Sequence, residues 1–338
     1  MPDSREVLAG RLRWQAAGCA VLGSPLYGSL LDAAADDLVK EGPVWELLRG
    51  FESEAESTAI ALRMMGAVHR LVLDDTLPEL APHYPSTGGD GDPKAAWPLF
   101  RLALLEHRDA MRAMVQQGCQ TNEVGRSAAL VGGFLEVSHR AGLPLRILEI
   151  GASAGLNLAW DRYRYESADG AWGDRASPVV FAHSFEVPPP LNRSAEVVER
   201  KGCDLNPIDP TSEDGALTLR SFVWADQLSR LALLDGAIEV ARQVPVEVER
   251  ANAADFLERE LAQPRPDIAT VVFHSVFIQY VSEADQIRIA AAIERAGVFH
   301  LTMEPKYPVF EIRLNGELLG TSMAHGTEVV WNVDSSTQ

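Results

Sequence analysis

Cysteine is scarce in this chain of 338 residues, which contains only Cys19, Cys119 and Cys203. The three are odd in number, far apart and outside any CxxC pair. Neither a disulfide framework nor a zinc site of standard spacing is therefore indicated. We expect reduced thiols in a cytoplasmic protein, and no bound metal.

The chain also has fewer basic than acidic residues and no long apolar run. Lys and Arg number 30 against 48 Asp and Glu, so 30 − 48 gives a formal net charge of −18. No run of Lys and Arg supplies the basic patch that a phosphate backbone needs, so a nucleic-acid partner is not expected. No uncharged apolar run reaches the roughly 20 residues of a membrane helix, and the first residues lack the apolar segment of a signal peptide. We expect a soluble protein that acts on small molecules.

The first 140 residues have helical periodicity almost throughout. Hydrophobic residues make up 46% of the chain, which is typical of a globular protein and not of a disordered one. Apolar residues recur at spacings of three and four across residues 44–73, as if on one buried helix face, and again across residues 126–141. We predict a helical N-terminal domain or cap over residues 1–140, which could also carry a homo-oligomer contact.

The pattern changes at Pro144, and residues 141–338 alternate strands with helices. LRILEI (145–150) is a short apolar strand that leads into a glycine turn and a segment with helical spacing. Later segments rich in β-formers lie at 179–181, 246–252, 269–277 and 298–304, with helices at 226–242 and from Ser282 to Gly297. This alternation predicts an α/β fold with a largely parallel, Rossmann-like sheet. Asn315-Gly316 predicts a type I′ hairpin, and with EVVWNV after it the sheet should end in antiparallel strands.

The sharpest motif lies where the first strand meets its helix: Glu149-Ile-Gly151-Ala152-Ser153-Ala-Gly155. Small residues let the backbone approach a ligand closely, and a helix N-terminus offers N–H groups to an anion. The string departs from the dinucleotide fingerprint, because Ser153 replaces the second glycine and no glycine follows at the sixth position. The string therefore does not follow the pattern of an NAD-binding turn.

Two other interpretations remain open. The string matches G-x-S-x-G, the nucleophile elbow of serine hydrolases, with Ser153 as nucleophile and Glu304 and His325 following in the required order. The strand ending in Glu149 and its glycine turn also resemble the first motif of class I S-adenosylmethionine (SAM) methyltransferases. That resemblance implies that Glu149, Gly151, Ala152, Ser153 and Gly155 surround the cofactor.

The methyltransferase resemblance extends to three later segments. Gly202-Cys-Asp204 resembles the second motif and implies that Asp204 binds the ribose, although 204 − 155 = 49 residues is longer than the roughly 20 expected. Either an insertion at about 167–197 intervenes, or Glu186 is the ribose acid. Asp255 resembles the residue that holds the adenine amino group, with a helix cap as its alternative role. His274, at the end of the fourth strand, is a candidate general base, or else a satisfied polar residue at a strand end.

Several of these strings together resemble a bacterial family catalogued as domain of unknown function 2332. They are QTNEVGR (120–126), LEIGASAGLNLAWDRYRY (148–165), GCDLNPID (202–209), SFVWADQ (221–227) and VVFHSVFIQY (271–280). The resemblance covers most of the chain. It implies a core similar to the methyltransferase fold.

The segment ending at Arg126 is expected beside the cofactor. It precedes the helix that leads into the first strand, and Asn122, Glu123 and Arg126 offer an amide, an acid and a base within about one helical turn. Such a set suits the zwitterionic methionine end of the cofactor. Alternatively, Asn122 caps the helix, and Glu123 and Arg126 form an exposed pair.

Taken together, the residues predict an S-adenosylmethionine-dependent methyltransferase acting on a small molecule. A serine hydrolase and a non-catalytic binding or scaffold protein on the same fold remain the alternatives.

Overall fold

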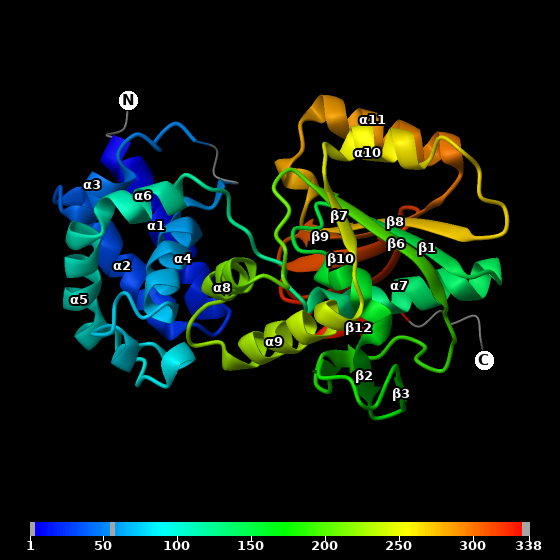
Figure 1. Ribbon diagram of the computed structural model, residues 1–338, viewed down its shortest axis with the longest axis horizontal. Helices are drawn as coiled ribbons and strands as arrows, with labels where there is room; N and C mark the ends of the chain where they lie inside the picture. Colours follow the sequence, from blue (N-terminus) through cyan, green and yellow to red (C-terminus); the bar gives the residue numbers. More distant parts are fainter. Residues whose placement is uncertain (1–3, 55–57, 333–338) are drawn as a thin grey trace. The chain divides into compact units, whose positions relative to one another are not determined.

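The computed structural model describes residues 4–54 and 58–332. The chain forms two compact units, one of Met1–Thr121 with Ser212–Ala232 and one of Asn122–Thr211 with Leu233–Gln338 (Figure 1). The sequence expectation placed the boundary near residue 140. The structure instead assigns residues 122–140 to the second unit and returns residues 212–232 to the first.

The first unit is helical. Its helices are α1 (Ser4–Val21), α2 (Pro25–Val39), α3 (Pro43–Leu48), α4 (Ile60–Leu73), α5 (Pro93–Glu106), α6 (Arg108–Val115) and α8 (Glu213–Ser221), with short 3₁₀ turns η2 (Ala81–His83) and η3 (Pro85–Thr87). The prediction of one helix face across residues 44–73 is wrong, because α3 ends at Leu48 and α4 begins only after Ala59, whose φ of 52° is left-handed. Residues 55–57 of that stretch lie outside the described residues.

The second unit is built on a nine-stranded sheet in the order β5-β12-β11-β10-β9-β8-β1-β6-β7. Five neighbouring strands are parallel: β7 (Glu247–Arg250), β6 (Val197–Asp204), β1 (Leu145–Ile150), β8 (Ala269–Ser275) and β9 (Phe299–Lys306). Numbered along the chain, these five strands have the order 3-2-1-4-5 of a doubly wound sheet, and the order reverses between β1 and β8. The α/β prediction, with LRILEI as a parallel strand, is confirmed.

The sheet ends in antiparallel strands, as the sequence predicts. They are β10 (Val309–Leu314), β11 (Glu317–Ser322) and β12 (Val329–Trp331), and β5 (Phe185–Val187) adds to β12 in parallel at the outer edge. The β10–β11 turn has positive φ at both Asn315 (51°) and Gly316 (84°), which is the type I′ signature. Val333 of the predicted last strand lies outside the described residues.

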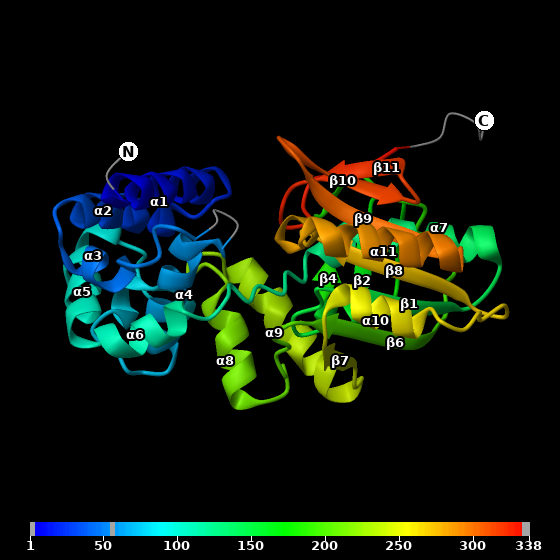
Figure 2. The same cartoon turned by 90° about the horizontal axis from the view of Figure 1, so that it is seen from above.

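Helices cover both faces of the sheet (Figure 2). On one face, α10 (Ala253–Glu260) and α11 (Glu283–Ala296) pack over Leu148 and Val272. On the other, α7 (Arg126–Ala141) places Phe134 edge-on to Phe273, with ring centroids 5.0 Å apart. The side chains of Val272 and Phe273 lie on opposite faces of the sheet because side chains alternate along a strand. The remaining helix, α9 (Leu228–Gln243), begins in one unit and ends in the other.

An inserted sheet explains the long spacing between the glycine turn and Asp204. The chain between β1 and β6 contains three short strands, β2 (Arg164–Ser167), β3 (Gly170–Trp172) and β4 (Val180–Phe181). They form a separate three-stranded sheet. The expected insertion at about 167–197 is therefore present, but it begins earlier and also supplies edge strand β5.

The α-helix expected after the glycine turn is absent from this described segment. Residues Leu156–Arg162 form a kinked 3₁₀ helix, η4. The Leu156 carbonyl, which an α-helix would use four residues later, accepts a 2.6 Å hydrogen bond from the Tyr163 hydroxyl. Tertiary contacts thus override the helical spacing of the sequence.

Candidate functional site

The candidate site lies at the carboxyl ends of β1 and β8, where the strand order reverses. Open α/β sheets bind ligands at this position. Three segments meet there: the glycine turn after β1, the turn Val276–Ile278 after β8, and Asp204 at the end of β6.

The glycine turn is held by its own main-chain amides. Ala152 N donates to the Cys203 carbonyl at 3.0 Å, and Ser153 N donates to Oδ2 of Asp204 at 2.9 Å. Leu156 N donates to Oδ1 of Asn122 at 2.9 Å. These amides are therefore not available to a phosphate, and the helix N-terminus that the sequence predicts for an anion does not form.

Asp204 lies beside the glycine turn, and Glu186 does not. The half-buried Asp204 carboxylate accepts from Ser153 N and, through Oδ1, from Asn206 N at 2.8 Å. Glu186 lies on β5, at the opposite edge of the nine-stranded sheet from β6 and β7. The alternative that Glu186 is the acid of the strand after β1 is therefore wrong.

Glu149 ends β1 beneath the turn and is only 3% exposed. Its Oε2 is buried without a hydrogen-bond partner in the described structure. Burial, and then repulsion by Asp204, raise the pKa of the Glu149 carboxyl well above its usual range, whereas Arg126 opposes the shift. A buried acid with a raised pKa, at the edge where α/β sheets bind ligands, is a candidate functional group.

The segment Asn122–Arg126 lies against the turn. Asn122 binds Leu156 N, and Arg126 donates from Nη1 to the Ser275 carbonyl at 3.2 Å, at the end of β8. Glu123 is only 5% exposed, and the N-cap of α7 is Gly125. The alternative of an Asn122 cap with an exposed Glu123–Arg126 pair is therefore wrong.

His274 is held at both ring nitrogens. Nδ1 lies 2.7 Å from Oε1 of Glu304, and Nε2 lies 3.1 Å from Nε2 of His300. Burial and the neighbouring His274 lower the pKa of His300 to about 3, so His300 is neutral near pH 7. The geometry favours the satisfied-histidine interpretation, since a general base would have to exchange one of these contacts.

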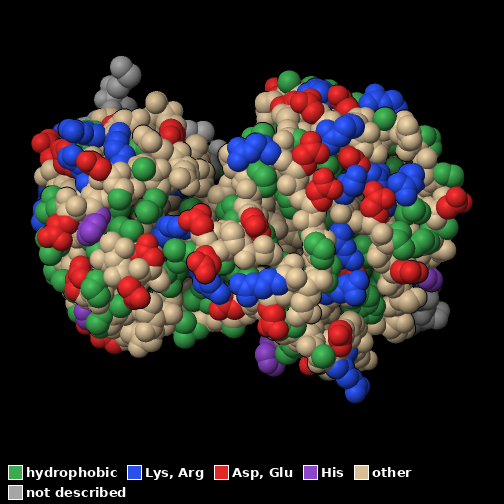
Figure 3. Space-filling view, viewed as in Figure 1, with side chains coloured by type: hydrophobic (Ala, Val, Ile, Leu, Met, Phe, Trp, Pro, Cys, Tyr) green, Lys and Arg blue, Asp and Glu red, His purple; other side chains and the backbone are tan. Residues whose placement is uncertain are grey.

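Asp255 lies at the surface. Its side chain is 62% exposed and pairs with Arg288 of α11 at 2.6 Å. The helix cap is Asn252, whose Oδ1 accepts from Ala254 N at 2.8 Å, so the cap role considered for Asp255 is wrong. Acidic and basic side chains are interspersed over α10 and α11 (Figure 3). The described contacts connect Asp255 to this surface network and not to the glycine turn.

The hydrolase residues are only partly assembled. Ser153 has a φ of 53°, and such strained backbone is expected of a nucleophile elbow. Glu304, however, binds His274 and not His325. The acid–histidine pair expected from chain order is therefore not formed.

The profile of a bacterial family described as "Uncharacterized protein conserved in bacteria (DUF2332)" matches residues 9–331. The chain belongs to the DUF2332 family. No curated protein and no solved structure matches it.

One string noted for the DUF2332 resemblance has a structural role away from the site. In SFVWADQ, the Asp226 carboxylate accepts from the Ser24 hydroxyl and, at 3.0 Å, from Leu26 N. It therefore caps the start of α2 from about 200 residues away. This contact explains why residues 212–232 belong to the helical unit.

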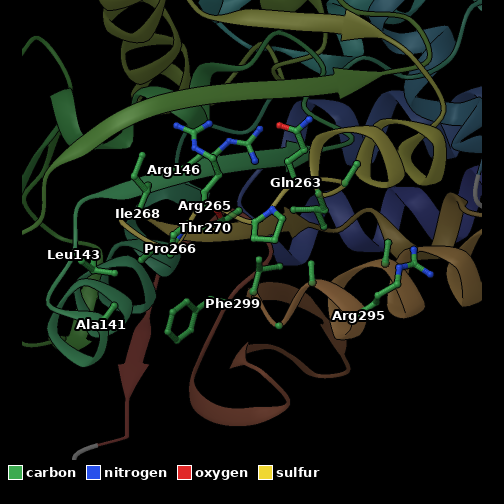
Figure 4. A pocket seen from close by; sticks show the side chains of 18 of the residues that line it. Ala141, Leu143, Arg146, Gln263, Arg265, Pro266, Ile268, Thr270, Arg295 and Phe299 are labelled. Atoms are coloured by element: carbon green, nitrogen blue, oxygen red, sulfur yellow. The ribbon is translucent and has the colours of Figure 1, made fainter.

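The DUF2332 chain also has a cavity of about 470 Å³ at the amino ends of the parallel strands. Arg146 and Arg265 lie side by side on its wall, with Phe299 across from them (Figure 4). Both arginines bind Glu199, and Arg146 also binds Glu260, so the charges are neutralised within the protein. This edge is opposite to the one where α/β sheets bind ligands, and we do not assign the site to it.

Two further observations concern residues 4–54 and 58–332 of this DUF2332 protein. They contain no group of three or more His, Cys, Asp or Glu side chains arranged to hold a metal ion. None of their helices combines the length and apolarity required to cross a membrane.

Residues near the site that the sequence analysis missed are Phe277, His300 and the pairing of Glu304 with His274. A signal for that pairing was present, because His274 and Glu304 each lie near the carboxyl end of a predicted strand. Consecutive parallel strands bring such ends to the same edge of a sheet.

Proposed function

We propose that this protein binds S-adenosylmethionine at the carboxyl end of β1 and transfers its methyl group to a small-molecule acceptor. The observation that carries the proposal is the bond from Ser153 N to Asp204 Oδ2. It joins the glycine turn of the first parallel strand to the acid of the second, at the reversal of a 3-2-1-4-5 sheet. An acid held beside a glycine turn at this edge could accept hydrogen bonds from the hydroxyls of an adenosine ribose.

The charges around the turn support a ligand without phosphates. The Asp204 carboxylate lies on this edge beside the buried Glu149 carboxyl, whose raised pKa favours its neutral form, and the turn amides are already bonded. Anionic phosphates would meet acids and few free donors, whereas a sulfonium ion and ribose hydroxyls would meet acceptors. The antiparallel final strands also agree with the methyltransferase resemblance of the sequence.

Each residue then has a proposed role. Gly151, Ala152, Ser153 and Gly155 would line the methionine and ribose, and Asp204 would accept from the ribose hydroxyls. Glu149, with its unpartnered Oε2, would orient the amino group, and Asn122 and Arg126 would lie at the methionine end. Asp255 is not retained for the adenine, because it is bound to Arg288 at the surface.

The cofactor would supply an electrophilic methyl group, and the protein would supply position. In-line transfer gains mainly from holding the methyl group and its acceptor in the reacting orientation. His274 is not free at either ring nitrogen, so we assign it no direct proton transfer.

A serine hydrolase is the second candidate, and the left-handed backbone of Ser153 favours it. A non-catalytic binding protein is the third, and would bind the cofactor without turnover. Calorimetric titration with S-adenosylmethionine and S-adenosylhomocysteine tests the binding step of the first proposal, since a hydrolase would give no heat with either compound. Formation of S-adenosylhomocysteine in the presence of an acceptor then separates a methyltransferase from a non-catalytic binding protein.

A further inference from the structure

The turn after β8 has a strained backbone at the edge of the site. Val276 has a φ of 52°. A β-branched residue in this region is a genuine outlier, because its side chain crowds the backbone. Such a conformation persists only when its surroundings fix it, and it is characteristic of ligand-binding turns.

Glu304 of β9 fixes this turn. Its Oε1 accepts from Phe277 N at 2.9 Å and from Ile278 N at 3.3 Å. The same oxygen lies 2.7 Å from Nδ1 of His274, which in turn contacts His300. One carboxylate oxygen therefore connects the end of β8 to the two residues that follow Val276.

The turn after β8 places the Phe277 ring against Gly151. A Cβ atom added to Gly151 would lie 2.1 Å from Cδ2 of Phe277. The ring therefore packs directly on the first residue of the glycine turn, and only glycine leaves room for it. The Phe277 ring therefore forms the wall of the candidate site at the glycine turn.

Fold stability alone does not account for Glu304. Its Oε2 is buried with no hydrogen-bond partner in the described structure. A buried unsatisfied oxygen is costly, and none of the three contacts of Oε1 requires it. Residues that break such a rule are commonly kept for function.

We propose that Glu304 is a positioning residue: by holding Phe277 N and Ile278 N, it seats the Phe277 ring on Gly151, and His274 orients its carboxylate. The claim that this wall contacts S-adenosylmethionine rests on the proposed function. The claim that Glu304 positions the Phe277 ring does not depend on it.

Amide hydrogen exchange of the ligand-free protein tests this inference directly. In Glu304→Ala, exchange should rise about tenfold in peptides covering residues 276–280 and 151–155, because the two amides lose their acceptor. Glu304→Gln keeps a carbonyl oxygen and should restore protection to within about threefold. The matched control is Glu311→Ala: Glu311 is the cross-strand partner of Glu304, but it binds Arg313 instead of the turn.

Unchanged exchange in Glu304→Ala would overturn the proposal. So would a rise spread equally over α11 and the rest of the sheet, because Glu304 would then support only the fold. If Glu304→Ala does not fold, His274→Ala and His274→Asn replace it, and protection should fall with alanine and be kept by asparagine, which retains a donor.

Binding provides the second readout. If the parent binds S-adenosylhomocysteine, Glu304→Ala should weaken the affinity about tenfold at a temperature where it is fully folded, and Glu304→Gln should restore it. If the parent does not bind, the proposed function fails, and the exchange experiment still decides the role of Glu304.

Discussion

Ser153 and Asp204, which are far apart in sequence, are joined by a 2.9 Å hydrogen bond from the main-chain N–H of one to Oδ2 of the other. The bond connects the turn after β1 to the end of β6. It fixes an acid beside a glycine turn at the edge where the strand order reverses.

Replacing Asp204 tests the role of the acid. Asp204→Ala should weaken binding of S-adenosylhomocysteine about tenfold or more, because a charged acceptor for the ribose and an anchor of the turn are both lost. Glu186→Ala is the matched control, since Glu186 is exposed at the other edge of the sheet. Equal affinities of the two variants in calorimetry would remove Asp204 from the site.

Gly151 tests the packing of the turn. Gly151→Ala and Gly142→Ala share a positive φ, 70° and 63°, but only the first meets another side chain, the Phe277 ring. Each should lose about 1–2 kcal/mol to the left-handed backbone, and Gly151→Ala about 1–3 kcal/mol more to the overlap. In a Phe277→Ala background the additional cost should largely disappear. Chemical denaturation measures both, and an identical cost of Gly151→Ala in the two backgrounds would contradict the contact.

Glu149 should make the protein less stable as the pH rises. Burial and Asp204 raise the pKa of its carboxyl above the ordinary value of 4.5, so the folded protein keeps a proton that the unfolded chain releases. Between these two pKa values, stability falls by about 1.4 kcal/mol per pH unit. Glu149→Gln lacks this loss, so its melting temperature should rise relative to the parent as the pH is raised above about 5. Parallel melting curves of parent and variant across that range would show that Glu149 ionises normally.

Ser153 separates the methyltransferase from the hydrolase. A fluorophosphonate probe should not label the parent, because the described Glu304 bonds go to His274 and the adjoining turn, leaving no Glu304–His325 pair to activate the serine. A known serine hydrolase labelled in the same experiment is the positive control. Labelling of the parent that disappears in Ser153→Ala would establish the hydrolase instead.

Elements fixed by local chemistry were predictable from the sequence. The helix α11 begins at the predicted cap, where Ser282 Oγ accepts from Asp285 N at 3.2 Å, and it ends at Gly297 with a φ of 62°. The Asn315-Gly316 hairpin likewise follows from residues that tolerate positive φ. In both, the deciding contacts lie within a few residues.

Elements fixed by distant contacts were not predictable. The kinked η4 replaces the expected helix because Asn122 binds Leu156 N across 34 residues. Asp226 draws residues 212–232 into the helical unit by capping α2. The Glu304–His274 pair depends on the register of β9 against β8, and periodicity in one sequence does not specify that register.

Calorimetric titration of ligand-free protein tests the central claim most directly. The account predicts a saturable heat with S-adenosylmethionine and with S-adenosylhomocysteine, one molecule per chain, and a clear loss of affinity in Asp204→Ala. Absence of heat with both compounds, in a protein shown to be folded and free of bound ligand, would contradict it.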